Sequence, residues 1–225
     1  MPIRLAVFDI AGTTVADDHA VANAFRNAFE SYGYGDISEE DVKPLMGYKK
    51  PIAIRMVLDK MDVEEDIELE EDIHDEFVSE MMDYYEYSPD VKPMPEAENV
   101  FLLLKEKGIK VALNTGFSKD IADVILRRLQ WKDRGLIDDY IASDEVEAGR
   151  PQPFMIQTLM QRAGITDANE VIKIGDTEVD VNEGRNAGCG LVIAVTTGAF
   201  TKEQLQEYNP DHIIDDLSQL PALIF

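Results

Sequence analysis

Acidic and hydroxyl-bearing residues follow a short apolar run close to the start of the sequence. Asp9 comes directly after residues 5–8, and Ala11, Gly12 and two threonines come next. An apolar run of this length, ended by turn-forming residues, is typical of a strand buried in a parallel sheet. Open α/β sheets place their ligands at the carboxyl ends of such strands, and small residues there let backbone amides approach an anion. This stretch alone fits equally well an Asp that opens a turn and caps a helix.

Two later segments repeat the arrangement. Thr115 and Gly116 follow an apolar run at 109–113 and precede a helix-like segment, so a hydroxyl group and a backbone amide are expected at a helix N-terminus, which favours phosphate binding. Asp176 and Asp180 follow the run at 171–174. If these strands lie beside the first one, the two carboxylates and Asp9 form an oxygen-rich site suited to Mg²⁺.

One basic residue is also expected near the ends of these strands. Arg150 lies between a glycine and a proline, just before another expected helix. Its guanidinium group can bind a phosphate group or balance the charge of Asp9, and the sequence leaves both roles open.

The periodicity of the apolar residues predicts the elements that position these side chains. Beyond residue 95, helices and strands alternate with short turns, which predicts an α/β fold with a doubly wound parallel sheet and the first strand in its middle. Strands are expected at 5–8, 109–113, 140–142, 171–174, 191–195 and 213–214, and helices at 96–108, 118–131 (with Ser118 as N-cap), 153–164 and 177–188.

Residues 16–95 contain no strand signal and read as an all-helical domain inserted directly after the first strand. Helices are expected from Asp17 onward, from 38 to a break near Pro44, at 51–60 and at 66–87. The core domain would then comprise residues 1–15 and 96–225. An insert at this point lies over the strand ends, where it can cover a ligand crevice.

Composition excludes several classes of function. The formal net charge of −24 over 225 residues argues against nucleic acid and anionic membranes as partners. The single cysteine, Cys189, allows no intrachain disulfide and suits a reducing cytoplasm. The first residues lack the apolar stretch of a signal peptide, and no apolar run reaches membrane-spanning length. We therefore expect a cytoplasmic protein, monomeric or homodimeric, and the phosphate-binding features at the strand ends indicate a small phosphate-bearing substrate.

Taken together and in this order, the segments resemble the haloacid dehalogenase superfamily of phosphoryl-transfer enzymes, with residues 16–95 matching its cap domain. The resemblance implies that Asp9 is a nucleophile that forms an aspartyl-phosphate. It also implies that Mg²⁺ is held by Asp9, by the carbonyl group of Ala11 and by Asp176, with Asp180 supporting the metal directly or through water. Thr115 and Arg150 would act on the phosphoryl group.

One position separates this chain from most phosphatases of the superfamily, which have a second Asp two residues after the nucleophile. Here that position is Ala11. The segment around it resembles the phosphonatase branch, which cleaves the C–P bond of phosphonoacetaldehyde and uses a lysine of the cap to form a Schiff base. The Met-Gly-x-x-Lys pattern of that branch matches Met46, Gly47 and Lys50. The resemblance implies a substrate site built from these residues and from Ala11, Gly12, Thr115, Gly116 and Arg150.

This chain departs from the sequence pattern of the phosphonatase branch at two positions. The branch carries a His three residues after the lysine, where this chain has Ala53, and often a Tyr where it has Phe117. His19 can replace that histidine or serve as a solvated hinge residue. Three functions stay open: a C–P hydrolase that uses Asp9, Mg²⁺ and Lys50; a phosphatase for activated phosphates that works without the second Asp; and a non-catalytic phosphate-binding relative.

Overall fold

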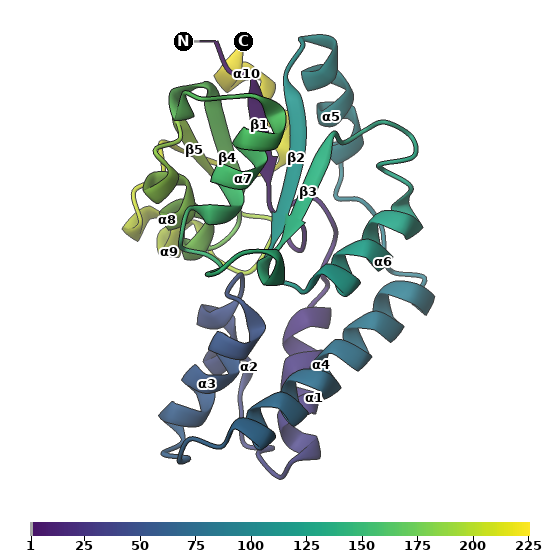
Figure 1. The fold of residues 1–225 in the computed structure, drawn as a ribbon, viewed down its shortest axis with the longest axis vertical. Coiled ribbons are helices and arrows are strands. Elements are labelled where there is room, and N and C mark those ends of the chain that lie inside the picture. The colour runs from purple at the N-terminus through teal and green to yellow at the C-terminus, as the bar shows by residue number, and fades with distance from the viewer. Residues whose placement is uncertain (1) are drawn as a thin grey trace.

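The computed structural model describes residues 2–225 and contains one six-stranded sheet. All of its neighbouring strands run parallel, in the order β3-β2-β1-β4-β5-β6, which confirms the doubly wound α/β fold with the first strand in the interior of the sheet (Figure 1). The strands are β1 (Leu5–Phe8), β2 (Lys110–Thr115), β3 (Asp139–Ala142), β4 (Val171–Gly175), β5 (Leu191–Val195) and β6 (His212–Ile214).

The register of β1 decides which residues meet at the carboxyl edge of the sheet. Phe8 pairs with Leu113 of β2 on one side and with Ile174 of β4 on the other. The residues that follow, including Asp9 and Thr115, are therefore brought to the same edge. The backbone amide of Asp9 donates to the carbonyl oxygen of Ile174 at 2.9 Å, which fixes the point where the chain leaves the sheet.

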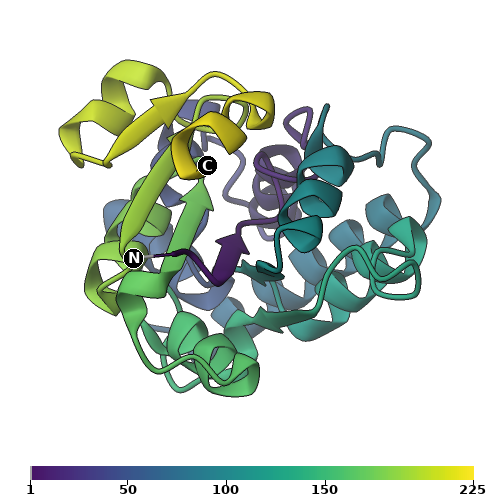
Figure 2. The same cartoon turned by 90° about the horizontal axis from the view of Figure 1, so that it is seen from above.

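Helices cover both faces of the sheet, because alternate residues of β1 point to opposite sides. Ala6 and Phe8 pack into a cluster with α5 and α6, whereas Leu5 and Val7 pack into a second cluster with α7 and α8. Figure 2 shows these layers from above. The helices of this part are α5 (Ala97–Glu106), α6 (Lys119–Leu129), α7 (Phe154–Ala163), α8 (Glu178–Ala187), α9 (Lys202–Glu207) and α10 (Pro221–Ile224), with short 3₁₀ turns η2 (Ser143–Glu145), η3 (Ala168–Glu170) and η4 (Leu217–Gln219).

A second group of helices lies at the carboxyl edge of the sheet (Figure 1). We call residues 16–95 the helical segment. The two stretches of chain that connect it to the sheet lie side by side. The amide of Ala16 donates to the carbonyl oxygen of Lys92 at 3.0 Å, and the amide of Met94 donates to that of Thr14 at 2.8 Å. The elements are α1 (Ala20–Ser31), α2 (Glu39–Val42), η1 (Lys43–Leu45), α3 (Lys50–Lys60) and α4 (Ile67–Tyr87). The division of the chain into two domains stays a prediction.

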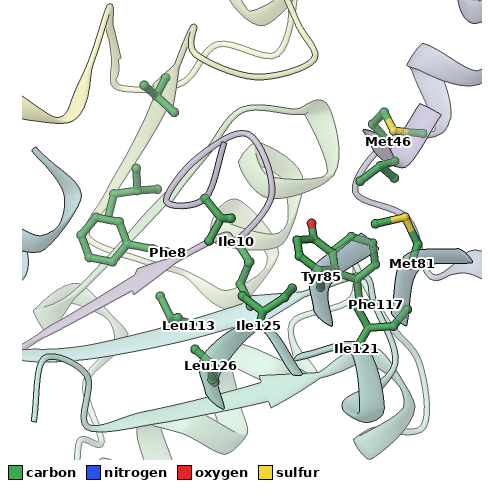
Figure 3. Close-up of a cluster of buried hydrophobic side chains, with 14 of the residues drawn as sticks. Phe8, Ile10, Met46, Met81, Tyr85, Leu113, Phe117, Ile121, Ile125 and Leu126 are labelled. Carbon is green, nitrogen blue, oxygen red and sulfur yellow. The ribbon is translucent and has the colours of Figure 1, made fainter. Parts of the chain in front are cut away.

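A continuous apolar core joins the helical segment to the sheet (Figure 3). Phe117, at the end of β2, packs against two aromatic residues of α4. Its ring centroid lies 6.4 Å from that of Phe77 and 5.9 Å from that of Tyr85. Aromatic pairs at these distances contribute beyond the area they bury, so α4 is attached where the ligand crevice was expected.

Two helix starts differ from the sequence-based expectation. Ser118 precedes α6, but its hydroxyl group makes no capping bond and has no partner among residues 2–225. Ser118 keeps the N-cap position, and the carboxylate of Asp144 accepts the first amide of the helix, that of Lys119, at 2.9 Å. In the helical segment, α1 begins at Ala20 rather than at Asp17, because Asp18 and His19 adopt positive φ angles of 28° and 63°.

Candidate active site

A cavity opens between the carboxyl edge of the sheet and the helical segment. It brings together residues from β1, β2 and β4 with the loop that precedes α3. Most of the residues expected to do chemistry line it: Asp9, Ala11, Met46, Gly47, Lys50, Thr115, Gly116, Arg150 and Asp176, together with Asp17, Val21, Phe117, Thr177 and Ala199. Of the remaining candidates, Gly12 lies against Asp176, and Asp180 contacts Arg150, which lines the cavity.

Asp9 and Asp180 share one guanidinium group. Nη1 of Arg150 donates to Oδ1 of Asp9 at 2.7 Å and also to Asp180. Burial of the Asp9 carboxylate raises its pKa, and Arg150 opposes that rise. Asp180 is different, because the positive charges of Arg150 and of the buried Lys173 outweigh its burial and lower its pKa to about 2.

The partners of Asp180 leave it no free oxygen. Its Oδ1 faces Arg150 and Nζ of Lys173, the latter at 3.0 Å, and its Oδ2 accepts the hydroxyl of Thr177 at 2.6 Å. Lys173 in turn donates to Asn114 at 2.6 Å and lies 3.4 Å from Glu183. This buried network orients Arg150. It was missed in the sequence because Lys173 lies inside an apolar strand with no motif around it.

Asp176 is a buried carboxylate without a cationic partner among residues 2–225. It accepts the hydroxyl of Thr13 at 2.9 Å and the amide of Ala199 at 2.7 Å. Burial and the nearby charge of Asp9 raise its pKa well above the ordinary value for Asp. Gly12 permits this approach, because it has a φ of 84° and a Cβ there would lie 2.8 Å from Oδ2 of Asp176.

The donor set fits a divalent cation. Two buried carboxylates, those of Asp9 and Asp176, raise each other's free energy when both are ionised, and a hard cation between them removes that repulsion. Ala11 lines the same cavity. No group of three or more His, Cys, Asp or Glu side chains in the described part of the chain is arranged to hold a metal, so Ala11 would have to complete the set with its main chain. Direct ligation by Asp180 stays untested.

Lys50 is the first residue of α3, and its side chain is only 3% exposed. Nζ lies 5.7 Å from the ring centroids of both Phe77 and Phe117. Its one hydrogen bond, to the carbonyl group of Tyr48, is long at 3.5 Å. Burial and then the positive charge of Arg150 lower its pKa to about 8. A neutral amine is therefore accessible close to physiological pH.

The loop before α3 lies directly on the sheet edge. Gly47 has a φ of 84°, and a Cβ there would lie 2.5 Å from the side chain of Val179. A Cβ on Gly116 would lie 2.5 Å from the carbonyl oxygen of Gly47. The hydroxyl of Tyr48 donates to Glu178 at 2.6 Å, which links the helical segment to the start of α8. The two glycines thus permit backbone-to-backbone contact over the cavity, and neither this contact nor the link was predicted.

Thr115 and Gly116 form the turn after β2 that was expected to bind a phosphate group. The Thr115 hydroxyl oxygen accepts the amide of Phe117 at 3.2 Å. Ser143 donates to the carbonyl groups of Gly116 and Phe117, both at 3.0 Å, and holds the turn from the β3 side. The cavity therefore has a rigid wall that carries a hydroxyl group and a backbone amide.

The position of His19 bears on the two roles that the sequence left open for it. Nδ1 of His19 lies 2.9 Å from Glu39, and its side chain is 70% exposed. It lines a neighbouring cavity and not the one that holds Lys50, which agrees with a hinge residue. Ala53 is buried in α3 and offers no proton-transfer group. Asp17, expected only to begin a helix, lines the cavity instead.

Comparisons with known proteins find relatives over most of the chain. Residues 6–195 match the sequence model of the haloacid dehalogenase-like hydrolases. A phosphonoacetaldehyde hydrolase of Bacillus mycoides is 30% identical over 230 residues, covering 93% of this chain and 83% of that protein, and one of Bacillus cereus is 29% identical with the same coverage.

Solved structures share the fold. A phosphonoacetaldehyde hydrolase-like protein of Oleispira antarctica superposes with a TM-score of 0.84 at 22% identity, over 100% of this chain and 92% of that one. A predicted phosphoglycolate phosphatase of Haemophilus somnus superposes with a TM-score of 0.80 at 18% identity, over 99% and 98%. Because the family model matches residues 6–195 and the solved structures share the fold of the whole chain, the chain belongs to the haloacid dehalogenase-like hydrolases.

Proposed function

We propose that this hydrolase cleaves the C–P bond of phosphonoacetaldehyde or of a related small aldehyde phosphonate. The observation that carries the proposal is the buried Lys50 in the same cavity as Asp9, with its pKa lowered to about 8. An amine in this state attacks an aldehyde to form a Schiff base. The position of Ala11 agrees, because a carbon leaving group that departs as an enamine needs no carboxylic acid beside Asp9.

The geometry supports the following roles for the other residues. The carboxylate of Asp9 forms a bond to phosphorus as the C–P bond breaks, and the electron pair of that bond enters the enamine on Lys50. Arg150, held by Asp180, and the turn at Thr115 bind the phosphonate oxygens. Water then hydrolyses the aspartyl-phosphate. A Mg²⁺ ion held by Asp9, Asp176 and the carbonyl group of Ala11 would supply charge neutralisation at the phosphoryl group. The helical segment would act as the cap that excludes water.

The test compares two adjacent lysines. Lys50→Arg keeps the positive charge but cannot form an imine, so it should lose C–P cleavage, whereas Lys49→Arg should stay active. Activity of the parent should rise with pH through about 8, because only the neutral amine of Lys50 attacks. Phosphate release from phosphonoacetaldehyde at saturating Mg²⁺ measures the activities of the two variants and the pH dependence of the parent. A Lys50→Arg protein that still cleaves this substrate would contradict the proposal, while loss of all activity in Asp9→Asn checks the nucleophile.

A phosphatase that acts on activated phosphates is the second candidate. Asp9, Arg150 and Thr115 suffice to transfer a phosphoryl group from a leaving group that needs no proton, such as an acyl phosphate. This function does not use Lys50, so Lys50→Arg would leave it intact. A panel that holds phosphonoacetaldehyde, an acyl phosphate and simple phosphate esters separates the two candidates, and no turnover on any of them would favour a phosphate-binding relative.

A further inference from the structure

Schiff-base chemistry at Lys50 requires a group that moves protons. The attacking nitrogen must lose a proton, and the carbonyl oxygen must gain two before it leaves as water. Burial excludes most solvent from Nζ, so a side chain has to take this part. Of the charged residues that line the cavity with Lys50, Asp9 is the proposed nucleophile and Asp176 a proposed cation ligand, and the guanidinium group of Arg150 does not titrate in this range. Asp17 is the remaining group.

The position of Asp17 suits proton transfer. It lies on the chain that leads from β1 into α1, and it lines both the cavity of Lys50 and the larger neighbouring cavity, where Asp18, His19 and Lys43 also lie. Its Oδ1 accepts the amide of Val21 at 3.0 Å, which fixes the carboxylate. No residue of the described chain donates to Oδ2. One oxygen is thus anchored, and the other is free to exchange protons between the two cavities.

The charged groups around Asp17 also suit proton transfer. Burial raises the pKa of Asp17 to about 6. The amide of Val21 and the charges of Lys50 and His19 lower this pKa, and the charge of Asp18 raises it. Tyr84 and Tyr85 face it from α4, and its charge is among the causes that raise the pKa of both phenols. The pKa values of Asp17, about 6, and of Lys50, about 8, lie on either side of neutral pH, so the carboxylate form of Asp17 and a neutral Lys50 amine are both accessible there.

We propose that Asp17 is the catalytic proton carrier of Schiff-base formation at Lys50, which rests on the proposed function. The Lys50 nitrogen forms a bond to the carbonyl carbon, and its proton passes through the Asp17 carboxylate to the carbonyl oxygen. Asp17 then takes a proton from solvent and donates it to the hydroxyl group of the carbinolamine. The C–O bond breaks, water leaves, and the nitrogen lone pair forms the C=N bond. After C–P cleavage the terminal carbon of the enamine takes a proton, which restores the imine. Water then adds to the imine carbon, the C–N bond breaks, and the aldehyde and the Lys50 amine are released.

The test follows imine formation without phosphorus chemistry. Acetaldehyde is the probe, cyanoborohydride in excess traps the imine, and peptide mass spectrometry measures the rate at which Lys50 is labelled. Asp17→Asn should slow labelling by about 10²-fold. Its amide oxygen can still accept from Val21, so α1 stays capped and the fold is kept. Asp17→Glu should retain more activity than Asp17→Asn, and Asp18→Asn, the adjacent control, should label at the parental rate.

The pH profile separates proton transfer from a structural role. Labelling of the parent should rise with pH through two ionisations, one near 6 for Asp17 and one near 8 for Lys50. Asp17→Asn should keep only the second, displaced to lower pH, because the negative charge that raises the pKa of Lys50 is gone. Equal labelling rates and unchanged profiles in Asp17→Asn and Asp18→Asn would overturn the proposal alone. A parent protein that never labels Lys50 would overturn the proposed function with it.

Discussion

Ala11 is the residue that separates the two candidate functions at the level of single side chains. Ala11 lines the cavity with Asp9, where a carboxylic acid would protonate a departing alkoxide. Without that acid, an ordinary phosphate ester has a poor leaving group, whereas the enamine that we propose for Lys50 would leave without a proton. The chemistry of the site is therefore limited by one missing carboxylate as much as by the residues that are present.

Restoring that carboxylate should change the substrate preference. Ala11→Asp should raise the hydrolysis of simple phosphate esters by at least about tenfold, because general acid–base assistance contributes about 10²–10⁴-fold. C–P cleavage should not gain. Steady-state phosphate release from both substrate classes measures the effect, and Ala11→Asn, which has the same size but cannot act as an acid, is the matched control. An ester rate in folded Ala11→Asp no higher than in Ala11→Asn would contradict this account.

Single residues also mark the limit of what the sequence could predict. Asp9, Thr115 and Asp176 were recognisable because each follows an apolar run that becomes a strand, and the structure brings them into one cavity or beside it. The burial of Lys50 was not recognisable, since it depends on Phe77 and Phe117, which are 27 and 67 residues away in the sequence. Asp17 was read as a helix start because local spacing carries no information on which cavity a side chain enters.

At the level of elements, the apolar runs predicted every strand to within two residues at either end, because strands buried on both faces need unbroken apolar stretches. The start of α6 shows where local patterns fail. Ser118 occupies the N-cap position, but its hydroxyl group makes no capping bond, and Asp144, 26 positions later, accepts the first amide of that helix. The cap of a helix in a packed domain is decided by tertiary contacts that no local window contains.

The contact between the loop before α3 and the sheet edge is testable through Gly116. Gly116→Ala would place a Cβ 2.5 Å from the Gly47 carbonyl oxygen and 2.6 Å from that of Tyr48, and both are backbone atoms. The loop must move, and Lys50 moves with it. We expect kcat/KM to fall by about 10²-fold, the loss that a displacement of about 1 Å can cause.

The control for this substitution lies in the helical segment itself. A Cβ on Gly35 would make an ordinary contact with Glu30 at 3.5 Å, so Gly35→Ala should keep parental kinetics. Far-UV circular dichroism and thermal melting establish that both variants are folded. Parental kcat/KM in Gly116→Ala would mean that the helical segment is not closed on the sheet during turnover.

At the scale of the whole molecule, a strongly acidic chain encloses a cavity lined by two cationic side chains. Asp and Glu outnumber Lys and Arg by 45 to 21, yet the cavity contains Arg150 and Lys50. The doubly wound sheet and the helical segment that follows β1 were predictable from the alternation of patterns along the chain, whereas their mutual fit was not, because it depends on Gly47 and Gly116 meeting across the two parts. Among residues 2–225, no helix is long and apolar enough to cross a bilayer.

The net charge of −24 predicts how the rate depends on salt. A phosphonate dianion is repelled as it approaches, and salt screens that repulsion, with a Debye length of about 30 Å at 0.01 M and about 8 Å at 0.15 M. We therefore expect kcat/KM for phosphonoacetaldehyde to rise roughly two- to fivefold over this range at fixed saturating Mg²⁺, with kcat unchanged. Labelling of Lys50 by acetaldehyde, which carries no charge, is the control and should not rise. If kcat/KM falls instead, the local field of Arg150 and Lys50 dominates the approach of the substrate over the charge of the whole surface.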